Sequence, residues 1–289
     1  MIEQWMKELE NPGTAYRSTP FWSFNDNLEP EELREQIRAM KEAGIGGFIM
    51  HARGGLLTPY MDDAWMNCIG ACIDEAEKQD MHAWFYDEKG WPSGFGGGAV
   101  AAADPVYHLR WLCCEECPEG NPLSLPEDGE AVLGYYAVGQ DGEAACLGEN
   151  PAASPGCQIY AVYTRTTAYY VDVLNPACVK AFIASTYDRY YERFADDFQK
   201  AAKGFFTDEP QFSREIPWST VFPEEFRRDT GEEVAEGLIN LFLPCRGYER
   251  FRYAYYRMAS RLYADSFGRQ VYEWCENHHC QLTGHAMLE

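Results

Sequence analysis

The sequence has 289 residues, of which 46% are hydrophobic, enough for one large α/β domain or two small ones and too many for a disordered chain. Its formal net charge is −22, from 46 acidic and 24 basic residues, so a polyanion such as nucleic acid would be repelled. A small neutral or cationic molecule is the better partner. No apolar stretch reaches the roughly 20 residues of a membrane helix, so no membrane association is expected.

The N-terminus and the cysteines indicate the compartment. The opening residues Met1-Ile2-Glu3-Gln4-Trp5 lack a basic region followed by an apolar run, so no secretory signal is predicted. The 11 cysteines are scattered, which is typical of reduced thiols in a cytoplasmic protein. Cys113, Cys114 and Cys117 form one local group, but no second Cys/His pair stands at the spacing of a zinc finger. We therefore predict a cytoplasmic protein without a disulfide framework.

Strands and helices alternate in the first hundred residues. An aromatic strand is predicted over residues 19–25 and a helix over 30–43, followed by a buried strand over 46–50. The next helix begins near Asp62, a suitable N-cap, and the third strand covers 82–85. Short links between alternating strands and helices predict a parallel sheet with right-handed crossovers.

The pattern changes between residues 104 and 173. Strand-like runs at 132–138, 157–164 and 167–173 are flanked by segments rich in proline and glycine. These runs predict a small antiparallel β insertion that grows from the loop after the third strand.

Helical periodicity returns after the insertion. A helix is predicted over 175–194, with Asn175 as its N-cap and Pro176 at its first position, and a fourth strand over 204–207. A loop-rich stretch leads to a long helix over 251–274 and a fifth strand over 281–285. The predicted divisions are thus residues 1–104, the insertion 105–173, and the continuation 174–289.

Polar side chains follow each of the five predicted strands. They are Asn25 and Asp26, His51 and Arg53, Asp87 and Glu88, Asp208 and Glu209, and His285 and Glu289. Because the carboxyl ends of the strands form the active-site face of a (β/α)8 barrel, we predict a TIM-barrel type of α/β fold. The alternative is a doubly wound sheet, but the glycines at 94–98 lack the spacing of a phosphate-binding loop. With five of eight strands, the barrel is expected to be incomplete and truncated at its C-terminal end, and its exposed edges favour self-association.

A set of motifs resembles the family 106 glycoside hydrolases, which are α-L-rhamnosidase-like enzymes. The motifs are Pro20-Phe21-Trp22, Ala43-Gly44-Ile45-Gly46-Gly47-Phe48, His51-Ala52-Arg53-Gly54-Gly55-Leu56-Leu57-Thr58-Pro59-Tyr60, Tyr86-Asp87-Glu88, Trp91-Pro92-Ser93-Gly94 and Thr207-Asp208-Glu209-Pro210. The resemblance spans residues 20–289 apart from the insertion. It implies the N-terminal portion of a catalytic barrel, attack on a terminal deoxy-sugar, inversion at the anomeric carbon, and room for a calcium ion near the site.

Glycoside hydrolysis needs one carboxyl group that donates a proton and a second that activates water or attacks the sugar. Glu209 is the predicted acid, because it closes a strand rich in phenylalanine and Pro210 fixes the chain after it. For the second carboxylate Glu289 and Glu88 compete, and a residue outside the chain is the third possibility.

The remaining strand-end side chains are predicted to bind the carbohydrate. His51, Arg53 and His285 suit hydrogen bonds to hydroxyl groups, and Trp91 suits stacking on a pyranose ring. The other predicted substrate ligands are Asp87, Asp208, Trp22 and Asn25.

Two alternatives to a glycosidase remain open. The histidines and aspartates could form the metal site of a metal-dependent barrel hydrolase, although no His-x-His pair follows the first strand. An inactive or truncated barrel would bind carbohydrate without cleaving it.

Overall fold

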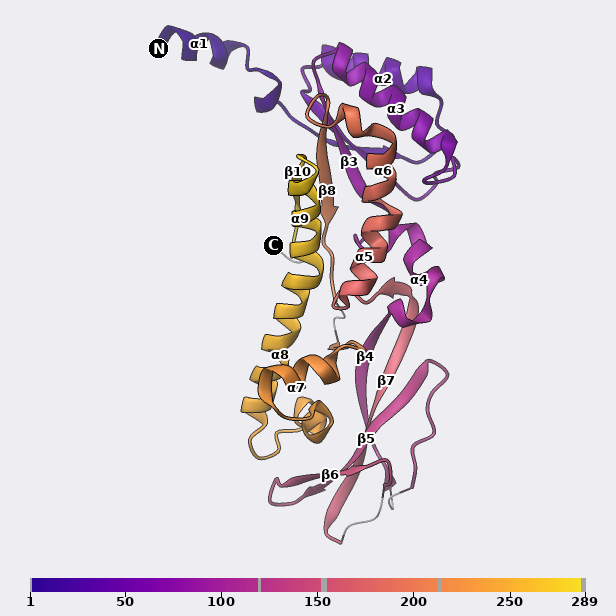
Figure 1. The fold of residues 1–289 in the computed structure, drawn as a ribbon, viewed down its shortest axis with the longest axis vertical. Coiled ribbons are helices and arrows are strands. Elements are labelled where there is room, and N and C mark those ends of the chain that lie inside the picture. The colour runs from indigo at the N-terminus through magenta and orange to yellow at the C-terminus, as the bar shows by residue number, and fades with distance from the viewer. Residues whose placement is uncertain (1, 119–120, 152–154, 213–214, 287–289) are drawn as a thin grey trace. The chain divides into compact units, whose positions relative to one another are not determined.

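The structure is a computed structural model that describes residues 2–118, 121–151, 155–212 and 215–286. These form two compact units, one from residues 1–99, 180–211 and 270–289 and the other from residues 100–179 and 212–269. The chain passes between the units several times, so each unit is assembled from separate stretches (Figure 1). The second unit takes in residues 212–269 as well as the predicted insertion.

A parallel sheet forms the centre of the first unit, and all five predicted strands are present in it. The strands are β1 (Phe21–Phe24), β2 (Gly47–Ala52), β3 (His82–Lys89), β8 (Ala202–Asp208) and β10 (Gln281–His285). They lie in the order β1-β2-β3-β8-β10 and every pair is parallel. Each new strand adds to the same edge, so the order does not reverse as it does in a doubly wound sheet. The fold is mixed α/β, and the described strands do not close into a barrel.

Helices connect these strands. The first unit contains α1 (Ile2–Glu10), η1 (Thr14–Tyr16), α2 (Pro30–Glu42), α3 (Asp63–Lys78), η2 (Gly96–Gly98), α6 (Tyr187–Phe194), η5 (Ala195–Asp197) and α9 (Gln270–Asn277). The helices α2 and α3 run side by side (Figure 1). Asp62 caps α3 as predicted, since its carboxylate accepts the Trp65 N–H at 2.9 Å. The helix predicted over 175–194 is divided into α5 (Pro176–Ser185) and α6, because Thr186 between them has a φ of −125°.

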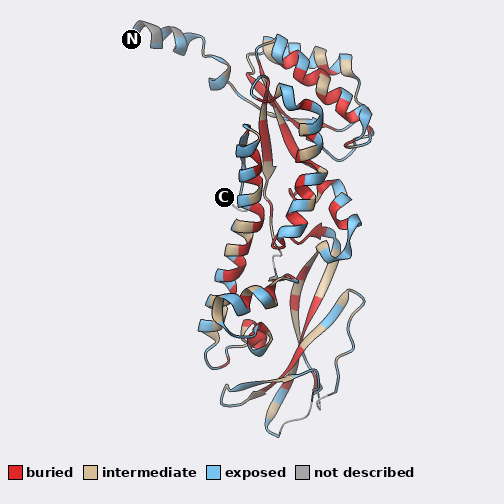
Figure 2. Ribbon diagram, in the orientation of Figure 1, coloured by how far each residue is buried: buried red, intermediate tan, exposed pale blue. Residues whose placement is uncertain are grey.

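The two faces of the parallel sheet have different neighbours. Phe85 and Phe205 face the helices, where their rings contact those of Tyr187, Tyr190 and other helical aromatic residues. Side chains alternate along a strand, so Tyr86 and Phe206 point to the opposite face. The inner positions of β2, β3 and β8 are mostly buried (Figure 2).

An antiparallel sheet forms the second unit, in the order β6-β5-β7-β4-β9. Its strands are β4 (His108–Glu116), β5 (Gly129–Gly139), β6 (Ala144–Gly148), β7 (Cys157–Val171) and β9 (Ile216–Trp218). Its helices are α4 (Ala99–Ala103), η3 (Pro105–Tyr107), α7 (Phe222–Thr230), η6 (Val234–Leu241), α8 (Tyr248–Tyr263) and the π-helical turn η7 (Ala264–Arg269). The sequence predicted this antiparallel sheet but not its strands β4, β6 and β9. The two strands predicted over 157–164 and 167–173 are parts of the single strand β7.

The stretch predicted to be loop-rich, before residue 248, contains α7 and η6. Phe222 and Leu238 from these helices are fully buried with Tyr255 of α8 in the main core of the second unit. Tertiary burial therefore stabilises two helices that are too short to give a clear periodic pattern. No helix in the described part of the chain is long and apolar enough to cross a membrane.

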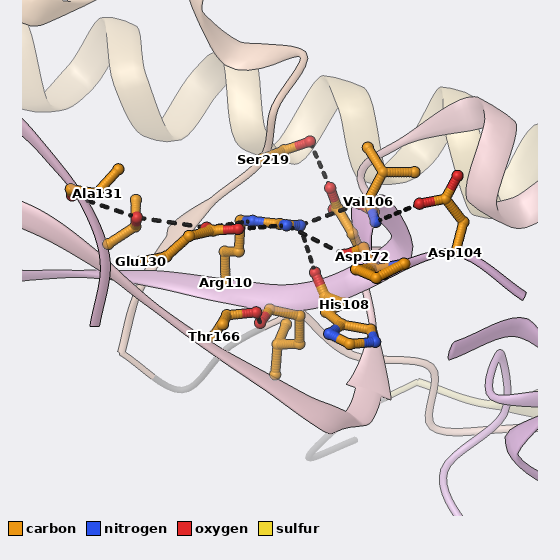
Figure 3. Close-up of polar contacts among 12 residues, drawn as sticks. Asp104, Val106, His108, Arg110, Glu130, Ala131, Thr166, Asp172 and Ser219 are labelled. Atoms are coloured by element: carbon orange, nitrogen blue, oxygen red, sulfur yellow. Dashed lines mark hydrogen bonds and ion pairs between the residues drawn. The ribbon is translucent and has the colours of Figure 1, made fainter. Parts of the chain in front are cut away.

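A buried arginine ties the start of the antiparallel sheet together (Figure 3). Arg110 on β4 donates from Nε and Nη2 to the two carboxylate oxygens of Glu130 on β5, both at 2.7 Å. Its remaining N–H groups donate to the carbonyl oxygens of Pro105, Val106 and His108 at 2.9–3.1 Å. The guanidinium thus satisfies five acceptors of the second unit at once.

Candidate functional site

Side chains from all five parallel strands meet on the sheet face opposite the helices. We call this group the open-face cluster; it consists of Phe21, His51, Tyr86, Phe206, Asp208 and His285. The Phe21 ring centre lies 4.9–6.3 Å from the ring centres of the other four aromatic or imidazole rings. Phe21 is 45% exposed, so the cluster opens to solvent. The sequence predicted three members, His51, Asp208 and His285, and missed the three aromatic ones.

Asp208 accepts hydrogen bonds at the centre of the cluster. The Tyr86 hydroxyl donates to its Oδ2 at 2.6 Å, and His285 Nδ1 lies 3.4 Å from its Oδ1. Burial, followed by the bond to Asp208, raises the pKa of Tyr86, so the phenol keeps its proton and remains the donor. Asp208 is therefore held in a fixed orientation by two neighbouring strands.

His51 is a neutral imidazole with one free acceptor. Its ring stacks on Tyr86 with centres 3.5 Å apart, and its Nε2 lies 3.0 Å from the Gly90 carbonyl oxygen, which requires a hydrogen on Nε2. Burial lowers the pKa of His51 to about 4, so at neutral pH Nδ1 carries no proton. Nδ1 has no partner among the described residues. Such a nitrogen can accept a hydrogen bond from a ligand hydroxyl.

Glu209 stands immediately after β8 in a left-handed conformation. Its φ is +46°, which costs a non-glycine residue roughly 1–3 kcal/mol and is found preferentially at functional sites. The Trp91 indole donates to Oε2 at 3.0 Å, and the Glu209 N–H donates to the His285 carbonyl at 3.1 Å. Oε1 has no partner among the residues that the structure describes. Glu209 is half-buried and Trp91 is 40% exposed, so both can reach a ligand.

Asp87 lies on the other side of the sheet. It is fully buried and accepts the Ser93 hydroxyl at 2.5 Å and the Tyr187 hydroxyl of α6 at 2.6 Å. Ser93 also binds the backbone of Asp208 twice, since its Oγ accepts the Asp208 N–H at 2.7 Å and its own N–H donates to the Asp208 carbonyl at 2.9 Å. Asp87 was predicted to bind substrate; its contacts instead make it the anchor that positions the Trp91–Gly94 loop against β8.

Glu88 is occupied by its own loop. Its two carboxylate oxygens accept the backbone N–H groups of Lys89, Phe95, Gly96 and Gly97 at 2.5–2.8 Å. Burial raises the pKa of Glu88 to about 8, and the backbone donors oppose that rise. No lone pair of the carboxylate is left for a substrate, which favours a structural role over the predicted catalytic one. Glu289, the other candidate, lies outside the described residues.

The remaining predicted ligands lie at the margin of the site. Trp22 faces the helices and donates from its indole to Gln36 Oε1 of α2 at 3.1 Å. With the exposed Asn25 it lines a hollow of about 200 Å³ between the end of β1 and the start of α2. Arg53 is exposed after β2, and its backbone N–H donates to Phe24. The structure therefore brings neither Trp22 nor Asn25 into the open-face cluster.

The burial of Asp87 predicts a pH dependence of stability. Burial raises the pKa of Asp87 to about 6, above the value of about 4 in an unfolded chain. The neutral carboxyl therefore stabilises the fold fully below about pH 4, and this contribution is lost as the pH rises through 6. Relative to Asp87→Asn, which does not titrate, the wild type should lose roughly 2 kcal/mol of unfolding free energy between pH 4 and pH 7. Urea unfolding of both proteins at each pH measures this, and a difference independent of pH would contradict it.

Tyr86→Phe tests the hydrogen bond at the centre of the cluster. The substitution removes the donor to Asp208 and keeps the ring that stacks on His51. A hydrogen bond to a charged group contributes roughly 1.5–3 kcal/mol, and we expect a loss of unfolding free energy in that range. Urea unfolding measures it. Tyr169→Phe, at an exposed tyrosine, is the control and should change stability by less than about 0.5 kcal/mol.

The described residues contain no group of three or more His, Cys, Asp or Glu side chains that could hold a metal ion. The carboxylates of Asp87 and Glu88 are already engaged in hydrogen bonds, as described above. Cys113 and Cys114 lie on β4, and all eleven cysteines are free thiols. We therefore assign none of these residues to the calcium ion that the family resemblance allows.

The chain was compared with protein families, curated proteins and solved structures. No protein-family model matches the chain, and no curated protein matches it in sequence. Among solved structures, a rhamnosidase from Novosphingobium sp. PP1Y has a similar fold, with a TM-score of 0.68 and 14% sequence identity. The match covers 97% of this chain and 47% of the rhamnosidase, so the chain spans about half the length of that protein. The chain thus has a rhamnosidase-like fold.

Proposed function

We propose that the protein is a glycoside hydrolase that acts on a terminal deoxy-sugar such as α-L-rhamnose, with Glu209 as the general acid. The observation that carries the proposal is the carboxyl group of Glu209, which is fixed by the Trp91 indole through Oε2 and has Oε1 available. It follows the same strand that supplies Asp208 to the open-face cluster. The rhamnosidase-like fold and the motifs of the family 106 enzymes support the choice of sugar.

The proposed reaction inverts the anomeric carbon. Glu209 donates a proton from Oε1 to the glycosidic oxygen while the bond from that oxygen to the anomeric carbon breaks. Water attacks the opposite face of the sugar ring and loses its proton to a second carboxylate. Glu289 remains the predicted base, with a residue outside the chain as the alternative.

The open-face cluster supplies the proposed sugar subsite. His51 Nδ1 and the Asp208 carboxylate accept hydrogen bonds from sugar hydroxyls, and His285 and Arg53 flank them. The ring of Phe21 offers an apolar surface to the methyl group that distinguishes a deoxy-sugar, and Trp91 offers a stacking surface at the same strand ends.

We further propose that the five parallel strands belong to a (β/α)8 barrel, whose interior would be the open face. Their sequential order is the order of strands in such a barrel, whereas a doubly wound sheet reverses direction. His51, Asp208 and His285 then lie at or near the carboxyl ends of their strands, as functional groups do in barrel enzymes.

A panel of nitrophenyl glycosides tests the proposal, with the complete polypeptide encoded by the gene as the enzyme. The α-L-rhamnoside should be cleaved fastest, and the released sugar should have the inverted configuration by NMR. Cleavage of no glycoside, with rhamnose still bound in calorimetry, would favour a carbohydrate-binding barrel instead. Loss of activity with a chelator, restored by one metal, would favour the metal-dependent hydrolase.

A further inference from the structure

Two cysteines meet where the last helix of the first unit turns into the last strand. Cys275 lies near the end of α9, and Cys280 directly precedes β10. The chain reverses between them at His279, whose φ is +55°, and the Cys280 N–H donates to the Cys275 carbonyl at 3.0 Å. Both side chains line the same hollow. The turn therefore brings the two cysteines close together.

The two thiols are not equivalent. The neighbouring Cys275 thiol lowers the pKa of Cys280, whereas the neighbouring Cys280 thiol raises the pKa of Cys275. Cys280 is thus the better nucleophile of the pair, because the thiolate is the reactive form. Burial raises the pKa of seven other cysteines: Cys68, Cys72, Cys113, Cys114, Cys117, Cys178 and Cys245.

A hollow gives small molecules a path to the pair. It has a volume of about 460 Å³ and is lined by both cysteines and by neighbours that include Trp84, Tyr272 and Leu282. Cys280 keeps 8% of its surface exposed, whereas Cys275 keeps 1%. A reagent therefore meets Cys280 first.

We propose that Cys275 and Cys280 form a dithiol site that is oxidised to a disulfide by a small thiol-derived disulfide such as oxidised glutathione. The Cys280 thiolate attacks one sulfur of the reagent, forms a mixed disulfide and releases one small thiolate. Cys275 loses its proton and attacks the Cys280 sulfur, which releases the second small thiolate. The two cysteines lose two electrons and two protons, and the reagent becomes two thiol molecules.

The new bond would tie the end of α9 to the start of β10. That strand carries His285 of the open-face cluster, so oxidation would restrict a strand that supplies a site residue. The dithiol chemistry itself does not depend on the proposed glycosidase function, and its test needs no substrate.

The test exposes the complete protein to oxidised glutathione, blocks the remaining thiols with an alkylating reagent and maps the peptides by mass spectrometry. We expect a peptide pair joined through Cys275 and Cys280, which a reductant separates. Cys68 and Cys72, two buried cysteines one turn apart on α3, are the internal control and should be recovered as alkylated thiols. Recovery of Cys275 and Cys280 as alkylated thiols, or pairing of either with another cysteine, would overturn the proposal.

Two variants test the order of attack. Cys275→Ser should stop at a mixed disulfide on Cys280, because the resolving thiol is absent. Cys280→Ser should form a mixed disulfide on Cys275 at least roughly tenfold more slowly, since that thiol is buried and holds its proton more tightly. Equal rates in the two variants would contradict the assignment of Cys280 as the nucleophile. The peptide map of the wild type decides the main proposal even if a variant fails to fold.

Discussion

Glu209→Gln should lower kcat/KM on an aryl α-L-rhamnoside by roughly 10²–10⁴-fold, the usual contribution of a general acid. The amide keeps the shape of the side chain and can still accept the Trp91 hydrogen bond, so binding of the sugar should change little. Because the lost function is proton donation, the deficit should be largest for a poor leaving group such as methanol. It should shrink for dinitrophenolate, which leaves without protonation.

Steady-state kinetics on substrates with leaving groups of graded basicity measure this effect. Glu42→Gln is the matched control, because it makes the same chemical change at an exposed glutamate at the end of α2. A Glu209→Gln protein with wild-type turnover on the methyl glycoside would show that another residue is the acid. A uniform loss on all substrates would indicate a role in binding.

The positions of the five parallel strands could be predicted from the sequence, but the faces of their side chains could not. Tyr86 and Asp87 are neighbours after the same apolar run, and the alternation of a strand sends them to opposite faces. Tyr86 reaches Asp208 on the open face, whereas Asp87 reaches Tyr187 of a helix that lies 100 residues further along the chain. Nothing local to residues 82–89 identifies which face the helices cover. The sequence analysis therefore named the charged Asp87 as a site residue and missed Tyr86.

The structural role of Glu88 could not be predicted from the sequence, for a different reason. Its partners include the backbone N–H groups of Phe95, Gly96 and Gly97. Every residue except proline has such a group, so the amino-acid types do not reveal these hydrogen bonds. The glycines at 94–98 were recognisable as a turn, but the direction of their N–H groups depends on φ values that the sequence does not give. Gly97, for example, has a φ of +62°. An anion-binding loop around a carboxylate of the same chain becomes visible only when that backbone is known.

Arg110→Met should lower the free energy of unfolding by roughly 2–4 kcal/mol, because it removes a buried guanidinium whose hydrogen bonds hold the Glu130 carboxylate and three backbone carbonyl groups. The methionine fills part of the space but leaves the Glu130 carboxylate and three carbonyl groups without their donor (Figure 3). Urea unfolding followed by circular dichroism measures the loss. Arg250→Met is the control in the same unit: Arg250 also pairs with a glutamate, Glu232, but its side chain is 81% exposed. Its loss should stay below about 1 kcal/mol.

The double variant Arg110→Met/Glu130→Gln separates the ion pair from simple loss of packing. If the main penalty is the loss of the positive partner of Glu130, neutralising Glu130 should recover a measurable part of the stability that Arg110→Met removes. If the two single losses merely add, the pair is not coupled, and the cost of Arg110→Met comes from the carbonyl groups near the start of β4 that lose the guanidinium as a donor. A single-variant loss no larger than that of Arg250→Met would show that the guanidinium does not hold this end of the antiparallel sheet together.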